Sequence, residues 1–189
     1  MDDVTISIMP KGATLDDLRR VEEKAELVNG EILRMTPSGG LHHFASVEVC
    51  DSLREYVRHT GHGIAFGDGA GFVVDLPHRR SFCPDAGYFV GALTRDFFGG
   101  APVFAVEIRS SEDYGPGAEK RLAAKRADYF AAGTLVVWDV DVERDGFVHS
   151  YLASQPESPQ ILRRGDVAEA EPAVPGWRLP VNNLFPDRR

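Results

Sequence analysis

The sequence predicts an α/β protein in which helices flank a mixed sheet, and three observations carry this prediction. Short apolar runs typical of strands recur along the chain, two longer segments have the period of helices, and turn dipeptides separate them. With 189 residues the chain is most simply one domain, long enough for a sizeable core. We expect the core of this domain at about residues 15–152, followed by an irregular tail over residues 153–189.

The first expected elements are a short helix, a hairpin and a long helix. Thr14 with an acid three residues later is an N-cap signal, which predicts a helix to about Glu23. The apolar runs of "AELVNGEILRM" flank Asn29-Gly30, a dipeptide suited to a type I′ turn. From Leu41 onward, apolar residues follow a helical period until the segment His59-Thr60-Gly61 ends it.

The rest of the chain predicts strands around one more helix. "HGIAFGDGAGFVVDLP" predicts two short strands joined by a glycine-rich hairpin turn; no helix and no Lys-Ser/Thr follow it, as a phosphate loop would require. We expect strands over residues 86–90 and 103–109, then a helix over about residues 118–132. "TLVVWDVD" and "GFVHSYL" predict a strand pair. The prolines between Pro156 and Pro180 predict at most short strands in the tail.

The composition is typical of a soluble globular protein and argues against several classes. No apolar run approaches the roughly 20 residues of a membrane span, so we expect no membrane partner. The N-terminus does not resemble a signal peptide, and the spacing of Cys50 and Cys83 fits neither a zinc pair nor a disulfide framework. These features predict a cytoplasmic protein. The net charge of −8 argues against a constitutive basic nucleic-acid binder, so a nucleic-acid partner would need a local basic patch or metal ions.

The segment "CPDAGYFVGALTRDFFGGAPVFAVEIRSS" places two acids in strands that are otherwise apolar. Side chains alternate along a strand, so Glu107 and Arg109 share one face while the opposite face is apolar. If the two strands pair, Asp85 lies near Glu107, and two close carboxylates require a proton or a cation between them. Mg²⁺ suits such a pair because it takes one or two carboxylates with waters and phosphate oxygens. Alternatively, Asp85 caps a turn and Glu107 pairs with Arg109 at a sheet edge.

The helix expected over residues 118–132 adds a candidate cation. At about 100° per residue, Lys125 falls between Leu122 and Tyr129, at the margin of the buried stripe. Two interpretations stay open. Its ammonium reaches the two carboxylates, or it is a lysine with a covered stem and a charge in water.

The motifs "PDAGYF", "FAVEIRSSEDYG" and "AKRADYFAAGTLVVWDVD" follow one another in this order, after the hairpin "AELVNGEILRMTPSGGLHH". Together they resemble the Uma-two family of restriction-endonuclease-like proteins. The resemblance runs from about Leu15 to about Leu184, nearly the whole chain. It implies a PD-(D/E)XK nuclease core, a mixed sheet flanked by helices.

The resemblance also implies which residues form the site. Asp85 matches the first acid of the nuclease motif and Glu107 matches the second. Arg109 occupies the position where the wider superfamily has a lysine. That position varies in this family, and Lys125 on the helix is implied to replace the missing lysine.

Two accessory residues and one departure complete the comparison with the family pattern. Glu31 matches the acid of the hairpin, and His42 matches the histidine that opens the long helix, with His43 as the alternative register. Residues 110–113, Ser-Ser-Glu-Asp, replace the usual Ser-Pro-Ser-Asp. The lost proline changes a turn just past the proposed site.

The chemistry that the resemblance implies is metal-dependent hydrolysis of DNA phosphodiester bonds. Asp85 and Glu107 would hold Mg²⁺, with Mn²⁺ as a substitute. Lys125 would orient the attacking water and stabilise the transition state. Arg109 could hold a phosphate oxygen but cannot act as a base at neutral pH.

The oligomeric state and the activity stay open at this point. DNA binding should be weak without metal, and a homodimer is compatible with the sequence. One alternative is a non-catalytic interaction module that keeps the fold, which the acidic balance and the altered turn favour. The other is a hydrolase of another phosphoester that uses the same carboxylates.

Overall fold

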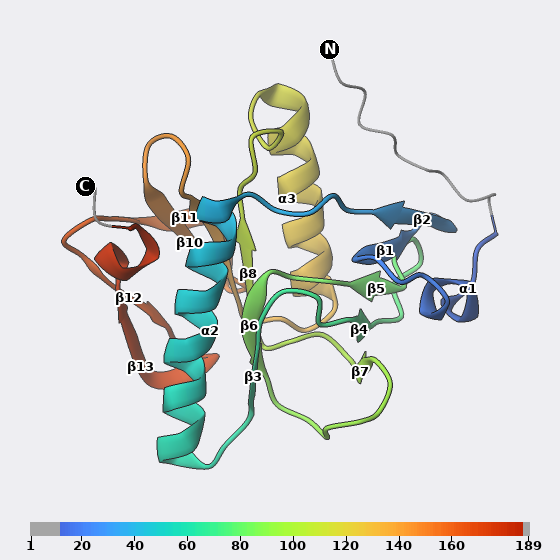
Figure 1. The fold of residues 1–189 in the computed structure, drawn as a ribbon, viewed down its shortest axis with the longest axis horizontal. Coiled ribbons are helices and arrows are strands. Elements are labelled where there is room, and N and C mark those ends of the chain that lie inside the picture. Colours follow the sequence, from blue (N-terminus) through green and yellow to red (C-terminus); the bar gives the residue numbers. More distant parts are fainter. Residues whose placement is uncertain (1–11, 187–189) are drawn as a thin grey trace.

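The protein is built around a six-stranded mixed sheet with a long helix on either side (Figure 1). The computed structural model describes residues 12–186. The strand order is β11-β10-β9-β8-β6-β3, and β8 (Phe104–Ile108) and β9 (Val136–Asp141) at the centre run parallel. The other neighbours in this sheet are antiparallel. The predicted fold class is confirmed.

The two long helices cover opposite faces of the sheet because the side chains of β8 alternate. Phe104 and Val106 point into the larger core cluster, where they join residues of α2 (Gly40–Thr60). Ala105 lies in a second cluster with Tyr129 of α3 (Pro116–Ala131). Helix α3 is the crossover that parallel strands require. Within residues 12–186, neither of these helices nor any other is long and apolar enough to cross a bilayer.

The strands predicted to carry the two acids are neighbours in the sheet. β6 (Ala86–Phe89) runs antiparallel to β8, with Ala86 opposite Val106. β3 (Ile64–Phe66) flanks β6 on its other side. The C-terminal end of β8 and the N-terminal end of β6 therefore lie side by side, at the same end of these two inner strands.

The first helix is shorter than predicted. α1 covers Leu15–Arg19, with Thr14 as its N-cap, and does not reach Glu23. The amides of Arg20 and Val21 each bond to a carbonyl three residues back, which tightens and ends the last turn. Leu18 of α1 is buried against the hairpin that follows.

The predicted hairpin is confirmed. β1 (Ala25–Val28) pairs antiparallel with β2 (Glu31–Arg34). Asn29 and Gly30 have φ values of 53° and 72°, as a type I′ turn requires. This hairpin is separate from the central sheet and lies next to β5 (Ser81–Phe82) (Figure 1).

The glycine-rich turn does not join a hairpin, so that prediction was wrong. β3 belongs to the central sheet, whereas β4 (Phe72–Val73) belongs to a small sheet with β5 (Ser81–Phe82) and β7 (Phe98–Gly99). Phe72 is fully buried in the second core cluster. Burial of this ring draws β4 away from β3, and the turn crosses from one sheet to the other.

The tail over residues 153–189 is not irregular as far as it is described, which corrects a second prediction. β10 (Phe147–Leu152) pairs with β9 as predicted, and β11 (Gln155–Arg163) adds to it as an edge strand. Pro156 and Pro159 lie in β11. An edge strand tolerates proline because one side of its backbone has no ladder partner to lose.

The last elements cover the face of the sheet on which α2 packs. β12 (Val167–Ala170) and β13 (Val174–Pro180) form a two-stranded sheet, followed by a 3-10 turn, η1 (Val181–Leu184). Trp177 of β13 lies 5.4 Å from Trp138 of β9, measured between ring centroids. The tail therefore completes the main core.

Gly87 of β6 should be intolerant of a side chain, because a β-carbon there would lie 2.2 Å from the carbonyl oxygen of Phe104 on β8. We expect Gly87→Ala to cost about 2 kcal/mol of unfolding free energy or more, measured by urea denaturation. Gly99→Ala is the matched control, since a β-carbon at Gly99 meets nothing within 4 Å. Equal stability of the two variants would contradict this reading of the β6–β8 contact.

Candidate active site

The Asp85 carboxylate is fixed at the edge where β6 and β8 meet. The Asp85 amide donates to the carbonyl of Val106 at 3.0 Å, which continues the ladder by one residue. Its Oδ2 accepts a hydrogen bond from the amide of Ile108 at 2.7 Å. Ser46 on α2 donates to the Asp85 carbonyl at 2.6 Å. The residue is 4% exposed, so its position is set by buried backbone contacts.

Two cationic or titratable groups contact the Asp85 side chain. Lys24 Nζ lies 2.5 Å from Oδ1, and His42 Nε2 lies 3.2 Å from Oδ2. Burial acts to raise the pKa of Asp85, but the hydrogen bond from His42 and the charge of Lys24 outweigh it and lower the pKa below its ordinary value. Burial acts to lower the pKa of His42, and its bond to Asp85 raises it overall. Asp85 is therefore held as a carboxylate.

Glu107 lies in the strand β8 and faces α3. Lys125 Nζ lies 2.8 Å from its Oε2, and the Tyr129 hydroxyl donates to its Oε1 at 2.6 Å. Burial raises the pKa of Glu107, and the charges of Asp85 and Glu26 add to this effect. Lys125 opposes it only in part, so the pKa of Glu107 lies above its ordinary value.

The hairpin supplies a third buried carboxylate. Glu26 of β1 is 3% exposed, and its Oε1 lies 2.8 Å from Lys125 Nζ. It also accepts the amide of Cys83 at 2.9 Å and the guanidinium of Arg79 at 2.5 Å. Burial acts to raise the pKa of Glu26, but Lys125 and Arg79 lower it overall.

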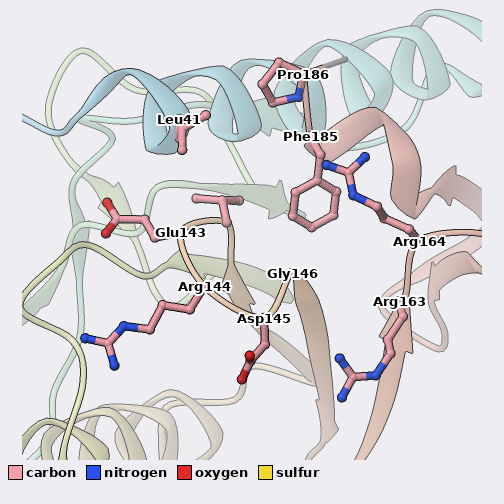
Figure 2. A pocket seen from close by; sticks show the side chains of 10 residues that line it. Leu41, Glu143, Arg144, Asp145, Gly146, Arg163, Arg164, Phe185 and Pro186 are labelled. Carbon is pink, nitrogen blue, oxygen red and sulfur yellow. The ribbon is translucent and has the colours of Figure 1, made fainter. Parts of the chain in front are cut away.

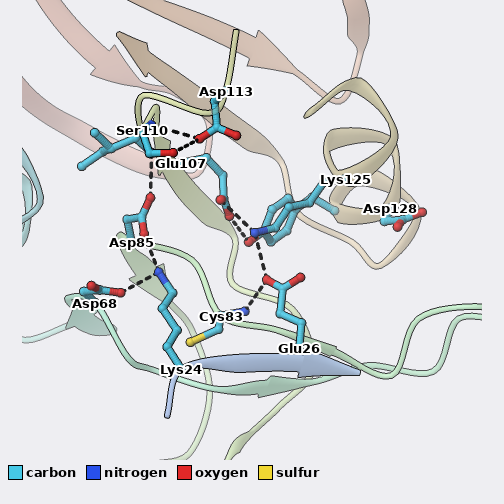
Figure 3. A network of polar contacts seen from close by, with 12 residues as sticks. Lys24, Glu26, Asp68, Cys83, Asp85, Glu107, Ser110, Asp113, Lys125 and Asp128 are labelled. Atoms are coloured by element: carbon cyan, nitrogen blue, oxygen red, sulfur yellow. Dashed lines mark hydrogen bonds and ion pairs between the residues drawn. The ribbon is translucent and has the colours of Figure 1, made fainter. Parts of the chain in front are cut away.

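Two lysines thus each bridge two carboxylates (Figure 3). Lys24 joins Asp85 to Asp68, at 2.5 and 2.6 Å. Lys125 joins Glu107 to Glu26, at 2.8 Å each. We call these four acids and two lysines the carboxylate cluster.

The carboxylate cluster and its immediate ion pairs carry an excess of negative charge. Arg79 extends the network from Glu26 to Asp128, whose other oxygen bonds to His78. Among the described residues this network joins five carboxylates to three permanent cations. The acids are Glu26, Asp68, Asp85, Glu107 and Asp128, and the cations are Lys24, Arg79 and Lys125. Two negative charges are left over unless a histidine or Glu107 is protonated. A single divalent cation would balance them.

The donor set fits a hard divalent ion such as Mg²⁺. Each oxygen of Glu107, and Oδ1 of Asp85, accepts only one hydrogen bond or ion pair from the described residues, which leaves lone pairs for a metal. Over residues 12–186 no group of three or more Asp, Glu, His or Cys side chains is arranged to hold a metal. Mg²⁺ does not need one, since it is bound by one or two carboxylates with waters and substrate phosphates.

Among the described residues, the Arg109 guanidinium bonds to neither Glu107 nor Asp85. Its guanidinium donates to both carboxylate oxygens of Asp139 at 2.7 and 2.6 Å, and to Glu119 of α3 at 2.5 and 3.1 Å. These paired contacts raise the pKa of Arg109 despite its burial. Its donors are directed to the β9–α3 junction, and Lys125 is the cation that contacts Glu107.

The two accessory candidates lie in different surroundings. His42 contacts Asp85 directly, and its Nδ1 is buried without a hydrogen-bond partner among the described residues. Glu31 is half-buried on β2, and within residues 12–186 no ion pair or hydrogen bond joins its side chain to the carboxylate cluster. The acid that the hairpin supplies to the cluster is Glu26.

The turn after β8 closes without the proline of the family pattern. Asp113 Oδ2 accepts the amide of Ser110 at 2.9 Å and its hydroxyl at 2.8 Å. The Asp113 amide in turn donates to the Ser110 carbonyl at 3.0 Å, so these reciprocal bonds hold the loop. The substitution of the proline therefore leaves an ordered turn beside Glu107.

The sequence reasoning missed Lys24, Glu26, Asp68 and Tyr129. For Glu26 a signal was present, because it lies inside an apolar strand one residue from the fully buried Leu27. Asp68 lies in the glycine-rich turn, whose pattern indicates a hairpin turn and gives no sign of a buried acid. Nothing in the local pattern around Lys24 distinguishes it from a surface lysine.

One cavity of the described residues lies apart from the carboxylate cluster. It has a volume of about 510 Å³ and lies between the start of α2, the β9–β10 turn and the C-terminal segment (Figure 2). Leu41 and Phe185 line it, with Arg163 and Arg164 along one side. A second pocket, beside Glu107 and Lys125, has only about 10 Å³, roughly the space of one water molecule.

The fold is that of a solved nuclease-like structure. A chain from Anabaena variabilis ATCC 29413, described as a "putative nuclease belonging to DUF820", superimposes with a TM-score of 0.72. The match covers 90% of this chain and 96% of that one at 18% sequence identity. No curated protein matches the chain.

The family follows from the sequence model that matches residues 13–182, whose description is "Putative restriction endonuclease". The chain belongs to this Uma2 family. The resemblance drawn from the sequence motifs is confirmed, and with it the restriction-endonuclease-like character of the fold.

The raised pKa of Glu107 predicts a pH-dependent effect of its removal. A pKa that is higher in the folded protein than in the unfolded chain means that the fold disfavours the charged form of Glu107. The free energy of unfolding therefore falls as pH rises from the pKa of the unfolded chain through that of the folded protein. We expect Glu107→Gln to gain stability relative to wild type as pH rises from about 4 to 7. Thermal melts across this range measure the difference.

The control for this experiment is Glu157→Gln on the exposed edge strand β11. It changes the net charge equally but leaves the carboxylate cluster intact. A stability difference for Glu107→Gln that is flat across the pH range, or that reverses sign, would contradict the assigned environment of Glu107.

Proposed function

We propose that this protein is a metal-dependent endonuclease that hydrolyses DNA phosphodiester bonds. The observation that carries the proposal is the pair of neighbouring strands that bring Asp85 and Glu107 to one end of the sheet, within a cluster of four carboxylates and two lysines. Membership of a restriction-endonuclease family supports the substrate class. Mg²⁺ is the proposed cofactor, with Mn²⁺ as a substitute.

Asp85 and Glu107 are the proposed metal-holding residues. A divalent cation there would supply Lewis acidity toward a phosphate oxygen and toward the attacking water. Asp85 suits this role because its lowered pKa keeps it ionised. Glu107 would release any proton it carries when the cation binds, because a positive charge favours the carboxylate form.

Lys125 is the proposed catalytic cation. Its ammonium has three N–H donors, and the contacts with Glu107 and Glu26 use two of them. The third is available to orient a water or to stabilise charge on the phosphate in the transition state. Arg109, whose donors point to Asp139 and Glu119, is proposed to support the strand and helix around the site instead of contacting the phosphate.

The shape of the site favours a polymer over a small phosphoester. The residues of the carboxylate cluster do not line the cavity of about 510 Å³, and the pocket beside Glu107 has room for about one water. Small substrates are usually enclosed in pockets of several hundred cubic ångströms. A nucleic-acid backbone does not require such an enclosing pocket.

A cleavage assay on supercoiled plasmid tests the proposal. We expect nicking with Mg²⁺ or Mn²⁺ that EDTA stops, and loss of at least about 100-fold in rate for Asp85→Ala and for Glu107→Ala. Lys125→Ala should lower kcat more than it weakens metal binding, since its role lies in the transition state. Binding of DNA should be weak without metal and should weaken further as salt rises.

The matched control is Asp51→Ala, which removes an exposed acid of α2 away from the carboxylate cluster. It should cut DNA like wild type. Equal trace cutting by wild type and both cluster variants would indicate a contaminant. The protein would then be better described as a non-catalytic module that retains the nuclease fold.

A further inference from the structure

Lys24 and Asp68 lie beside Asp85 without belonging to the nuclease motif. Lys24 directly precedes β1, and its carbonyl accepts the amide of Met35 at 2.9 Å, so its backbone is fixed by the hairpin. Its side chain is 19% exposed and ends between Asp85 Oδ1 and Asp68 Oδ1. Figure 3 shows the ammonium between these two carboxylates.

The glycine-rich turn after β3 holds Asp68 in place. A β-carbon at Gly67 would lie 3.4 Å from Cys50 Sγ of α2, and one at Gly71 would lie 2.7 Å from the ring of Phe97. Gly69 has a φ of +92°, which residues with side chains rarely adopt. The turn is therefore pinned between α2 and the Phe97 segment. Among the described residues, Lys24 is the only ion-pair partner of Asp68.

The contacts around Asp85 restrict where a metal can approach it. Oδ2 already accepts the Ile108 amide and lies 3.2 Å from His42 Nε2, whereas within residues 12–186 Oδ1 contacts only Lys24. A metal must therefore use Oδ1, the oxygen beside the ammonium. An ammonium and a dication that share one carboxylate oxygen repel strongly, because both charges lie within a few ångströms. Lys24 has to leave Oδ1 when the metal binds.

We propose that Lys24 is an internal counter-ion of Asp85 that a divalent metal displaces, and that Asp68 retains the displaced ammonium at the site. The inference rests on the proposed metal role of Asp85. Lys24 neutralises Asp85 in the metal-free protein and lowers the affinity for metal. Asp68 reduces that competition, because the ammonium keeps one carboxylate when it loses the other.

Mn²⁺ binding to the DNA-free protein, measured by isothermal titration calorimetry, tests this inference. Lys24→Met keeps a side chain of similar length without the charge, and we expect it to bind Mn²⁺ roughly tenfold more tightly than wild type. Lys120→Met is the matched control, since it removes the same charge from an exposed position of α3. It should bind like wild type. Unchanged or weaker binding by Lys24→Met would overturn the proposal.

Asp68→Asn in two backgrounds isolates the role of the second carboxylate. In the wild-type background it should weaken Mn²⁺ binding, because the ammonium then has only Asp85. In the Lys24→Met background it should have little effect. A loss of the same size in both backgrounds would mean that Asp68 acts on the metal directly, and would overturn its role as the anchor of Lys24.

Two further measurements separate the possible failures. Asp85→Asn should abolish Mn²⁺ binding; if wild type itself binds none, the proposed metal-dependent function fails and not only this inference. If Lys24→Met does not fold, ¹⁵N NMR of the lysine ammonium groups in wild type replaces it. The chain has four lysines, so substitution of the other three assigns the signal. The Lys24 signal should move on addition of Mg²⁺, and an unmoved signal would overturn the proposal.

Discussion

The bridging of buried carboxylates by lysines is the interaction on which the site depends. Carboxylates are costly to bury alone, and here β1, β8, α3, the turn after β3 and the residue before β6 bring five of them into one region. The ammonium groups are shared between acids that come from different elements. Each lysine therefore connects an acid at the end of a central strand to an acid from another element. Removal of a lysine would leave two acids without their shared cation, whereas removal of one acid leaves the lysine paired with the other.

Much of the fold could be predicted because its local patterns are strong. The Asn29-Gly30 turn, the helical period of α2 and the alternation in β8 all agree with the elements observed. The errors arose where tertiary contacts decide. Burial of Phe72 places β4 in another sheet, and an edge position lets β11 continue through two prolines. Neither choice is visible within a window of ten residues.

The site was predictable to the extent that its residues interrupt a pattern. Asp85 and Glu107 were visible as charges in apolar strands, and Lys125 was visible through its helical phase. Lys24 and Asp68 were not, because an isolated lysine before a strand and an acid between glycines have ordinary surface explanations. Their meaning depends on a contact across 61 positions, between Lys24 and Asp85. For Arg109, the alternation of side chains along β8 was not enough to identify its partners. Its guanidinium donates to Asp139 and Glu119, which lie on β9 and α3.

The separate β1–β2 hairpin has a consequence for the order of folding. The contact between Lys125 and Glu107 spans 18 positions and closes within the β8–α3 unit, whereas that between Lys24 and Asp85 spans 61. Contacts of short span form with less loss of chain entropy, so we expect the sheet and α3 to assemble first. Asp85 then lacks its lysine partner until the hairpin docks. The docking step brings opposite charges together from a distance, so its rate should fall as dissolved ions screen that attraction.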